Sequence, residues 1–175
     1  MIHFTSQAEW ALKRLTSRDA EHRGSSAFGG LRGRHQATSA RTIDANTLID
    51  FCSIAEYFTI ARLTAVVPGV TAQELSNWEL RKNAWLKYAG LDLDSYTGWA
   101  SFRGFVEVRN AIAHGDGRLT DQQLGKHKDQ ILRFIHASSV ELNGDHLRFM
   151  PKDVDKCGQV CTSFIRWLDG AAPAP

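Results

Sequence analysis

The chain has 175 residues, a length that predicts one domain with at most a short arm, and its net charge of +2 is too small to identify a nucleic-acid-binding protein. With 43% hydrophobic and 23% charged residues, the composition is that of an ordinary globular protein and excludes a collagen-like or wholly disordered chain. No apolar run approaches the roughly 20 residues of a membrane span, and the first residues lack the pattern of a secretory signal. We therefore expect a cytoplasmic protein that does not enter the membrane.

Three cysteines, Cys52, Cys157 and Cys161, fit a reducing compartment in which thiols stay free. Cys157 and Cys161 are one helical turn apart, and a zinc site is one interpretation of this pair. The pair lacks the second half that zinc spacing patterns have. We therefore expect the three side chains to be small buried groups on packed faces, and we predict no metal and no cofactor.

Positive charge is concentrated in the N-terminal third, where residues 1–41 hold seven Lys/Arg against three Asp/Glu; the remainder holds 14 against 16. Four glycines between Gly24 and Arg34 predict a loop. Its arginines are candidates for contacts to an RNA backbone, although a solvated surface loop is the simpler interpretation. We divide the chain into an N-terminal helix with this basic loop (residues 1–41), a helical domain (42–170) and a frayed tail (171–175).

The spacing of apolar residues predicts helices along most of the chain. The first begins at Ser6, with Glu9 in capping-box register, and ends near Arg23. The longest covers 43–67, and its predicted inner face carries Leu48, Phe51, Cys52, Ala55, Phe58 and Arg62. Four more helices are expected: one capped by Thr71, one over 96–114 before Gly115-Asp116-Gly117, one capped by Thr120, and one over 151–168.

One segment predicts β structure. Asn143-Gly144 is flanked by alternating apolar residues between 139 and 149, which is typical of a hairpin with a two-residue turn. In that register Val140 lies opposite Leu147. The expected fold is all-α, an antiparallel bundle of five or six helices with this hairpin appended.

The segment before Gly115 carries the residues that point to chemistry. On a helical wheel of 100° per residue, an apolar stripe contains Phe102, Phe105, Val106 and Ile112, and Arg109 falls in the middle of it. Surface helices normally place arginine on the opposite side. We therefore expect this stripe to meet a partner surface near a two-fold axis, where the charge of Arg109 is matched.

Asn110 and His114 lie on the flank of that stripe, one turn apart, where the amide can bond the imidazole. His114 is the last residue before Gly115, and the free carbonyls at a helix C-terminus favour a cation. Arginine binds phosphate and histidine transfers protons, so this set suits cleavage of a phosphodiester. Because Arg109 and His114 differ by about 140° around the axis, two such helices facing each other suit this chemistry better than one.

The sequence Arg109-Asn110-Ala-Ile-Ala-His114 resembles the Arg-Asn-x-x-x-His signature of the HEPN superfamily, the higher eukaryote and prokaryote nucleotide-binding domains. Residues 42–168 resemble the domain, including its helical bundle and an acidic–aromatic step at Glu56-Tyr57-Phe58. The resemblance implies a metal-independent endoribonuclease with Arg109, Asn110 and His114 as its catalytic residues. It also implies a homodimer, an RNA substrate and a product with a 2′,3′-cyclic phosphate.

The resemblance further implies a toxin or antiviral-defence effector, with an antitoxin or a defence-system protein as partner. In toxins silenced by nucleotidyl transfer, a tyrosine follows the histidine by two residues, and this chain has Asp116 there. The alternative is a non-catalytic HEPN-like module that binds a nucleotide, RNA or a partner protein. The five tryptophans are expected in the core, with Trp99 as a candidate platform for base stacking.

Overall fold

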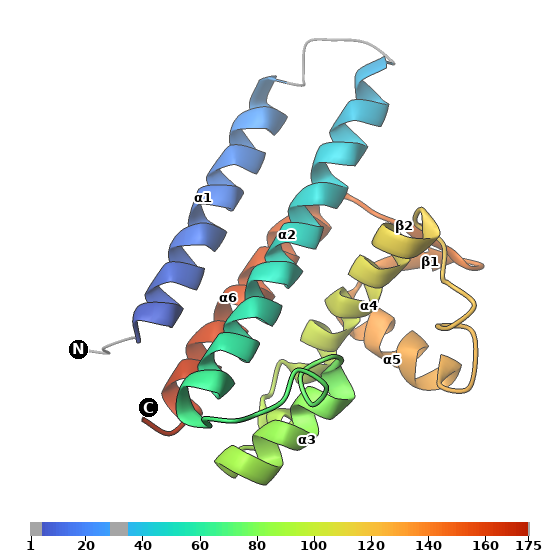
Figure 1. Ribbon diagram of the computed structural model, residues 1–175. Helices are drawn as coiled ribbons and strands as arrows, with labels where there is room; N and C mark the ends of the chain where they lie inside the picture. The colour runs from blue at the N-terminus through green and yellow to red at the C-terminus, as the bar shows by residue number, and fades with distance from the viewer. Residues whose placement is uncertain (1–4, 29–34, 175) are drawn as a thin grey trace.

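The computed structural model describes residues 5–28 and 35–174, with the side chains of 5–24 and 44–174. Within these ranges the chain forms an all-α bundle with one appended hairpin, as the sequence predicts (Figure 1). The elements are α1 (Ser6–Phe28), α2 (His35–Val66), α3 (Trp78–Ala89), a 3₁₀ helix (Leu93–Ser95), α4 (Trp99–Gly115), α5 (Lys128–Ser138), β1 (Glu141–Asn143), β2 (His146–Arg148) and α6 (Pro151–Ala171). None of the described helices has the length and apolar character that crossing a bilayer needs.

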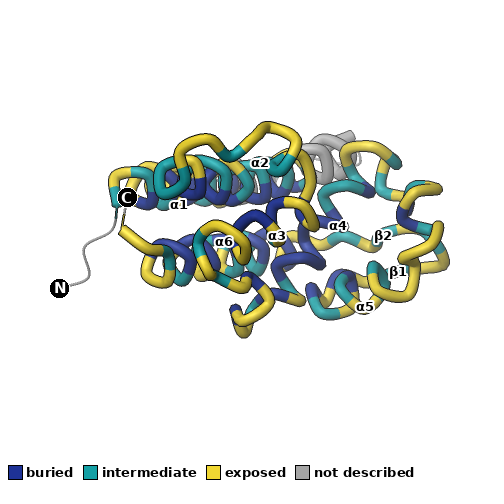
Figure 2. Tube along the Cα trace, turned by 60° about the horizontal axis from the view of Figure 1, so that its bottom comes forward, coloured by how far each residue is buried: buried dark blue, intermediate teal, exposed yellow. Residues whose placement is uncertain are grey.

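Three long helices, α1, α2 and α6, pack side by side and form one half of the molecule (Figure 1). Helix α4 lies against α2 and α6, and α5 covers the far side of α4. In Figure 2 the buried segments of α1, α2 and α6 face one another, and the exposed segments lie outward. The predicted inner face of α2, from Leu48 to Arg62, is buried in the structure, and this prediction is confirmed.

A cluster of aromatic rings joins α3, α4 and α6. Phe102 and Phe164 stack with ring centroids 4.1 Å apart, and the edge of Trp78 meets Phe102 at 5.1 Å. Trp99 stacks on Phe102 at 5.8 Å and is only 7% exposed. Trp99 is therefore a core residue, and the candidate role in base stacking was wrong, because its ring is already covered by the aromatic core.

Buried arginines support the bundle at two places. Arg62 of α2 lies 3.3 Å from Asp169 of α6, with both side chains nearly inaccessible to solvent. Arg81 of α3 pairs with Glu56 of α2 at 2.9 Å and lies over the ring of Trp78 at 4.5 Å. Since a buried charge needs a partner, these pairs specify how α2 meets its neighbours.

The first two helices are longer than predicted. Helix α1 continues through Gly24 to Phe28, where the first residues of a loop were expected. Helix α2 begins at His35, eight residues before the predicted start. The remainder of the basic loop, including Arg32 and Arg34, lies outside the described residues.

Two helices begin later than predicted, although the capping pairs form. Thr71 and Glu74 exchange hydrogen bonds of 3.0 and 3.3 Å, but they close a turn, and α3 starts only after Asn77, whose side chain accepts from Leu80 N. Thr120 likewise accepts from Gln123 N at 3.3 Å, and α5 begins at Lys128. A capping pair satisfies local backbone donors and does not by itself extend a helix.

The hairpin forms, but its turn lies one residue later than predicted, so that Leu147 pairs with Leu142 and not with Val140. Leu142 pairs with Leu147 and Asn143 with His146, so the turn residues are Gly144 and Asp145. Gly144 has φ of 66°, and Asn143 is not among the residues with positive φ. The expected turn needs positive φ at both Asn143 and Gly144, and a turn with glycine at its first central position replaces it.

The C-terminal end of α4 is fastened to this hairpin. Asp116 takes the left-handed conformation with φ of 51°, and Gly117 N donates to Ala111 O at 3.1 Å, which ends the helix. Leu147 N then donates to Gly117 O, and Leu119 N to Asp145 O, both at 2.8 Å. The hairpin therefore holds in place the last turn of α4, which carries His114.

Candidate active site on helix α4

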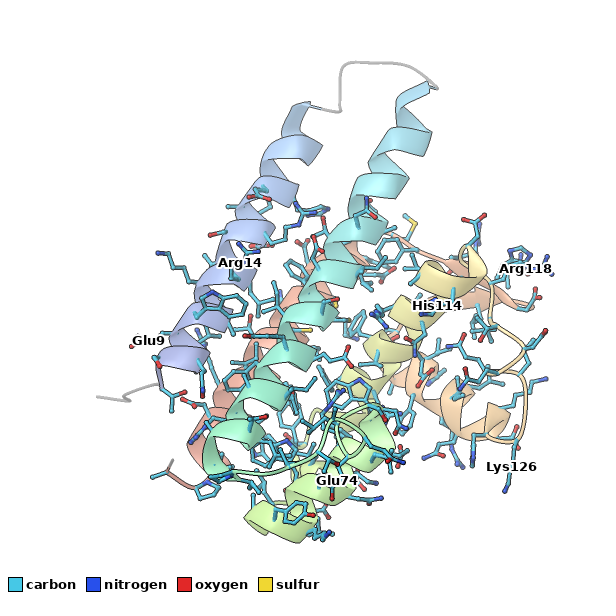
Figure 3. The ribbon with its side chains drawn as sticks, viewed as in Figure 1. Glu9, Arg14, Glu74, His114, Arg118 and Lys126 are labelled. Carbon is cyan, nitrogen blue, oxygen red and sulfur yellow. The ribbon has the colours of Figure 1, made fainter. Side chains whose placement is uncertain are left out.

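The three predicted site residues lie on the last two turns of α4. His114 is exposed, whereas Arg109 and Asn110 are half-buried. Figure 3 labels His114 near the end of α4, with Arg118 of the following loop beyond it. The structure thus places the predicted polar set at the solvent boundary of the bundle.

Asn110 interacts with Arg109 in a way that the sequence did not suggest. Its side-chain oxygen accepts from Arg109 Nη1 at 3.0 Å. We expected Asn110 to orient the ring of His114, and its amide oxygen is instead used by the guanidinium. Asn110 and His114 are about 40° apart around the helix, so the amide that holds Arg109 lies on the side of α4 where His114 is exposed.

The apolar stripe of α4 is not a free surface. Phe102 and Phe105 are fully buried and Val106 is 4% exposed, all within one chain. This burial contradicts the predicted place of these three residues at a dimer axis, whereas Ile112, the fourth residue of the stripe, is half-buried. The solvent-facing arc of the final turns carries Ala113 and His114 instead.

A cleft of about 900 Å³ opens beside the last turn of α4, on the side of Ile112 and Asp116. Its other walls come from Ala45 of α2, from the β2 strand and from the start of α6 with Lys152. On the helical wheel Ile112 and His114 point in nearly opposite directions. The cleft and the exposed histidine therefore lie on different sides of the same helix end.

A second concave surface of about 700 Å³ lies between α1 and α2. Trp10 and Tyr57 are 46% and 58% exposed there, with ring centroids 5.2 Å apart. Arg14 lies over the Trp10 ring at 5.8 Å, and Arg18 also lines the surface. Trp10 was expected in the core; it lies at the edge of the α1–α2 pair, with its ring against Tyr57.

The structure brings together three residues that the sequence did not associate as one group. Cys52 of α2 and Cys157 of α6 have their Sγ atoms 3.8 Å apart, and Cys157 and Cys161 Sγ are 4.0 Å apart. All three are buried. Two features of the sequence could have predicted this cluster: Cys52 lies on the inner face of α2, and Cys157 and Cys161 are one helical turn apart on α6.

The thiol of Cys52 is unusually acidic for a buried cysteine. Hydrogen bonds from Cys157 and Cys161 stabilise its thiolate, the positive charge of Arg109 adds to this, and together they lower the pKa of Cys52 to about 5 against the effect of burial. Burial and the bonds to its two neighbours raise the pKa of Cys157. Arg109 thus acts electrostatically on Cys52 beneath it and by a hydrogen bond on Asn110 beside it.

Comparison of the chain with protein-family models, with curated proteins and with solved structures finds no match.

Proposed function

We propose that this protein is an endoribonuclease of the HEPN type that cleaves RNA without a metal ion, with Arg109, Asn110 and His114 as its catalytic residues. The observation that carries the proposal is the hydrogen bond from Arg109 Nη1 to Asn110. It holds the guanidinium against the amide, and the exposed imidazole of His114 follows one turn further along α4. The signature residues supply the family expectation, and the bonded pair of Arg109 and Asn110 supports it.

Each residue has a role that its chemistry supports. Arg109 binds the scissile phosphate and stabilises the charge that builds on its oxygens. His114, exposed at the helix end, transfers protons during attack by the RNA 2′-hydroxyl. Asn110 positions Arg109 through the hydrogen bond at 3.0 Å. The bond from phosphorus to the 5′-oxygen breaks, and a 2′,3′-cyclic phosphate and a 5′-hydroxyl remain.

A second copy of the chain completes the site in this proposal. The solvent-facing arc with Ala113 and His114 replaces the buried stripe as the surface that faces the two-fold axis. Two signatures across this axis supply two arginines and two histidines to one RNA strand. We place the enzyme in the cytoplasm as a toxin or antiviral-defence effector, held in check by an antitoxin or a defence-system partner.

A second candidate function is a non-catalytic module that binds RNA or a partner protein. The exposed Trp10–Tyr57 pair, with Arg14 and Arg18 around it, favours this candidate. Aromatic rings and cations in one concave surface suit stacked bases and phosphates. If the protein is such a module, Arg109, Asn110 and His114 on α4 have a structural role and not a catalytic one.

Labelled RNA incubated with the purified protein in EDTA separates the two candidates. The enzyme predicts cleavage that persists in the chelator, with products that end in a cyclic phosphate. Binding of intact RNA without any cleavage, in several unrelated RNA sequences, contradicts the enzyme and supports the module.

A further inference from the structure

The three cysteine sulfurs have the geometry of a ligand set. Their Sγ atoms all lie within 4.8 Å of one another, with two of the three edges at 3.8 and 4.0 Å. An ion bound at a metal–sulfur distance of about 2.3 Å in the centre of three sulfurs requires edges of about 4.0 Å. The third edge, between Cys52 and Cys161 Sγ, is no longer than 4.8 Å, so only this distance has to shorten for an ion to lie among the three sulfurs.

Two rigid elements hold this arrangement. Cys157 and Cys161 are successive-turn positions of α6, and Cys52 faces them from the middle of α2. The helices are close at this level, because a Cβ added at Gly158 would lie 2.9 Å from the ring of Phe51. The sulfurs are consequently brought together by the packing of the bundle and not by a loop.

The donor set selects the kind of ion. Within the described residues the group holds three cysteines, with no fourth side chain from His, Asp or Glu. Structural zinc sites are nearly always four-coordinate, and a dry, all-sulfur site suits a softer ion. Copper(I) is the soft physiological ion that three thiolates can satisfy.

Metal binding replaces the thiol protons of cysteine ligands, and a nearby positive charge assists this step. The positive charge of Arg109 favours a thiolate at Cys52. The charge of Arg109 that favours this thiolate also offsets the negative charge that three thiolates leave around a monovalent cation. Glu56 opposes this effect, and its own carboxylate is paired with Arg81.

We propose that Cys52, Cys157 and Cys161 bind one copper(I) ion in trigonal coordination between α2 and α6. No cysteine belongs to the proposed catalytic set, so copper uptake is measured separately from RNA cleavage. The bound ion joins the two helices across the core and stabilises the folded chain in proportion to its affinity.

The test uses the full chain, reduced and free of thiol reagents, titrated under anaerobic conditions with copper(I) held by bicinchoninate. The parent is expected to withdraw one equivalent of copper and to melt at a higher temperature when loaded. The control is the triple variant Cys52→Ser, Cys157→Ser, Cys161→Ser, which removes all three cysteines and retains all seven histidines. It is expected to withdraw none, and each single variant is expected to lose the stoichiometric uptake.

X-ray absorption of the loaded parent gives a second result that does not depend on folding of the variants. Three sulfur ligands and no nitrogen support the site. A parent that takes up no more copper than the triple variant overturns it, as does a nitrogen ligand in the spectrum. Displacement of copper by an equal concentration of zinc(II) overturns the assignment to copper.

Discussion

Thr5 donates two hydrogen bonds to the carboxylate of Asp169, from its hydroxyl at 2.6 Å and from its backbone nitrogen at 2.9 Å. Asp169 also faces Arg62 at 3.3 Å, and Arg62 donates to Pro173 O at 2.8 Å. One buried carboxylate therefore links the start of α1, the C-terminal half of α2 and the end of α6. The α1–α2–α6 layer is closed by this junction.

Replacing Asp169 with alanine should destabilise the chain strongly. The change leaves the buried guanidinium of Arg62 without its carboxylate, and breaking a buried pair costs about 3–5 kcal/mol. Thr5→Val is the milder comparison, because it removes only the hydroxyl donor and should cost about 1 kcal/mol. Urea denaturation measures both, and equal midpoints for the parent and Asp169→Ala would show that the junction does not contribute to stability.

A second stability prediction concerns the contact between α4 and α5. A Cβ added at Gly104 would overlap the backbone carbonyl of Phe134. Backbone cannot move aside as a side-chain end can, so Gly104→Ala should push the two helices apart and cost about 1–3 kcal/mol. Gly170→Ala is the matched control in a helix, since no atom lies within 4 Å of the added carbon. Its unfolding temperature should equal or slightly exceed that of the parent.

The catalytic proposal predicts that His114→Ala reduces RNA cleavage by about 10²- to 10⁴-fold, because proton transfer is lost. The unfolding temperature should change little, since His114 is exposed at a helix end. His136→Ala is the matched control: His136 is also exposed in the last turn of a helix, α5. Cleavage by His114→Ala at the rate of the parent would falsify the assigned role.

The dimer is predicted to form through the exposed arc at the end of α4. Ala113→Glu places two like charges near the proposed two-fold axis and should yield monomers with little RNA cleavage. Ala100→Glu adds the same charge to an exposed position in the first turn of α4 and should leave the dimer intact. Light scattering measures the mass, and a parent that remains at 19.5 kDa at micromolar concentration contradicts the dimer.

Glu74 provides a prediction about pH. A hydrogen bond from Tyr88, then bonds from Thr71, and the charge of Lys87 lower the pKa of Glu74 from 4.5 to about 2. A lowered folded-state pKa means that the contribution to stability is complete above about pH 4.5 and is lost as pH falls through about 2. In NMR titrations, Tyr88→Phe should raise this midpoint and Tyr57→Phe should leave it unchanged. A titration midpoint of Glu74 near 4.5 in the parent would show that the hydrogen bonds from Tyr88 and Thr71 do not stabilise its carboxylate.

The sequence predicted the periodic features best. The inner face of α2 from Leu48 to Arg62 follows from apolar spacing, because burial along a helix repeats every three to four residues. The turn of the hairpin was predicted one residue too early. Its position depends on which residue takes positive φ, and among residues 143–145 only Gly144 does. Both α3 and α5 were placed too early because Thr71 and Thr120 cap turns and not helices.

The candidate site shows what a sequence pattern cannot predict about tertiary packing. A helical wheel shows that Phe102 and Phe105 lie beside Arg109, but it does not say whether the covering surface belongs to the same chain or to another. Cys52 is more than 100 residues from Cys157 in the sequence. Their proximity depends on how α2 packs against α6, which is a property of the tertiary structure.

The junction of Thr5 with Asp169 also determines where the chain can be rejoined or labelled. Because both ends of the described chain meet there, a short glycine–serine linker suffices to connect them, and the chain can be reopened in a surface loop as a circular permutant. In Figure 1 the start of α1 and the end of α6 lie at the opposite side from the hairpin that holds the end of α4. Affinity tags or fluorophores joined beyond these helix ends are therefore expected to be remote from His114 and from the proposed RNA-binding face.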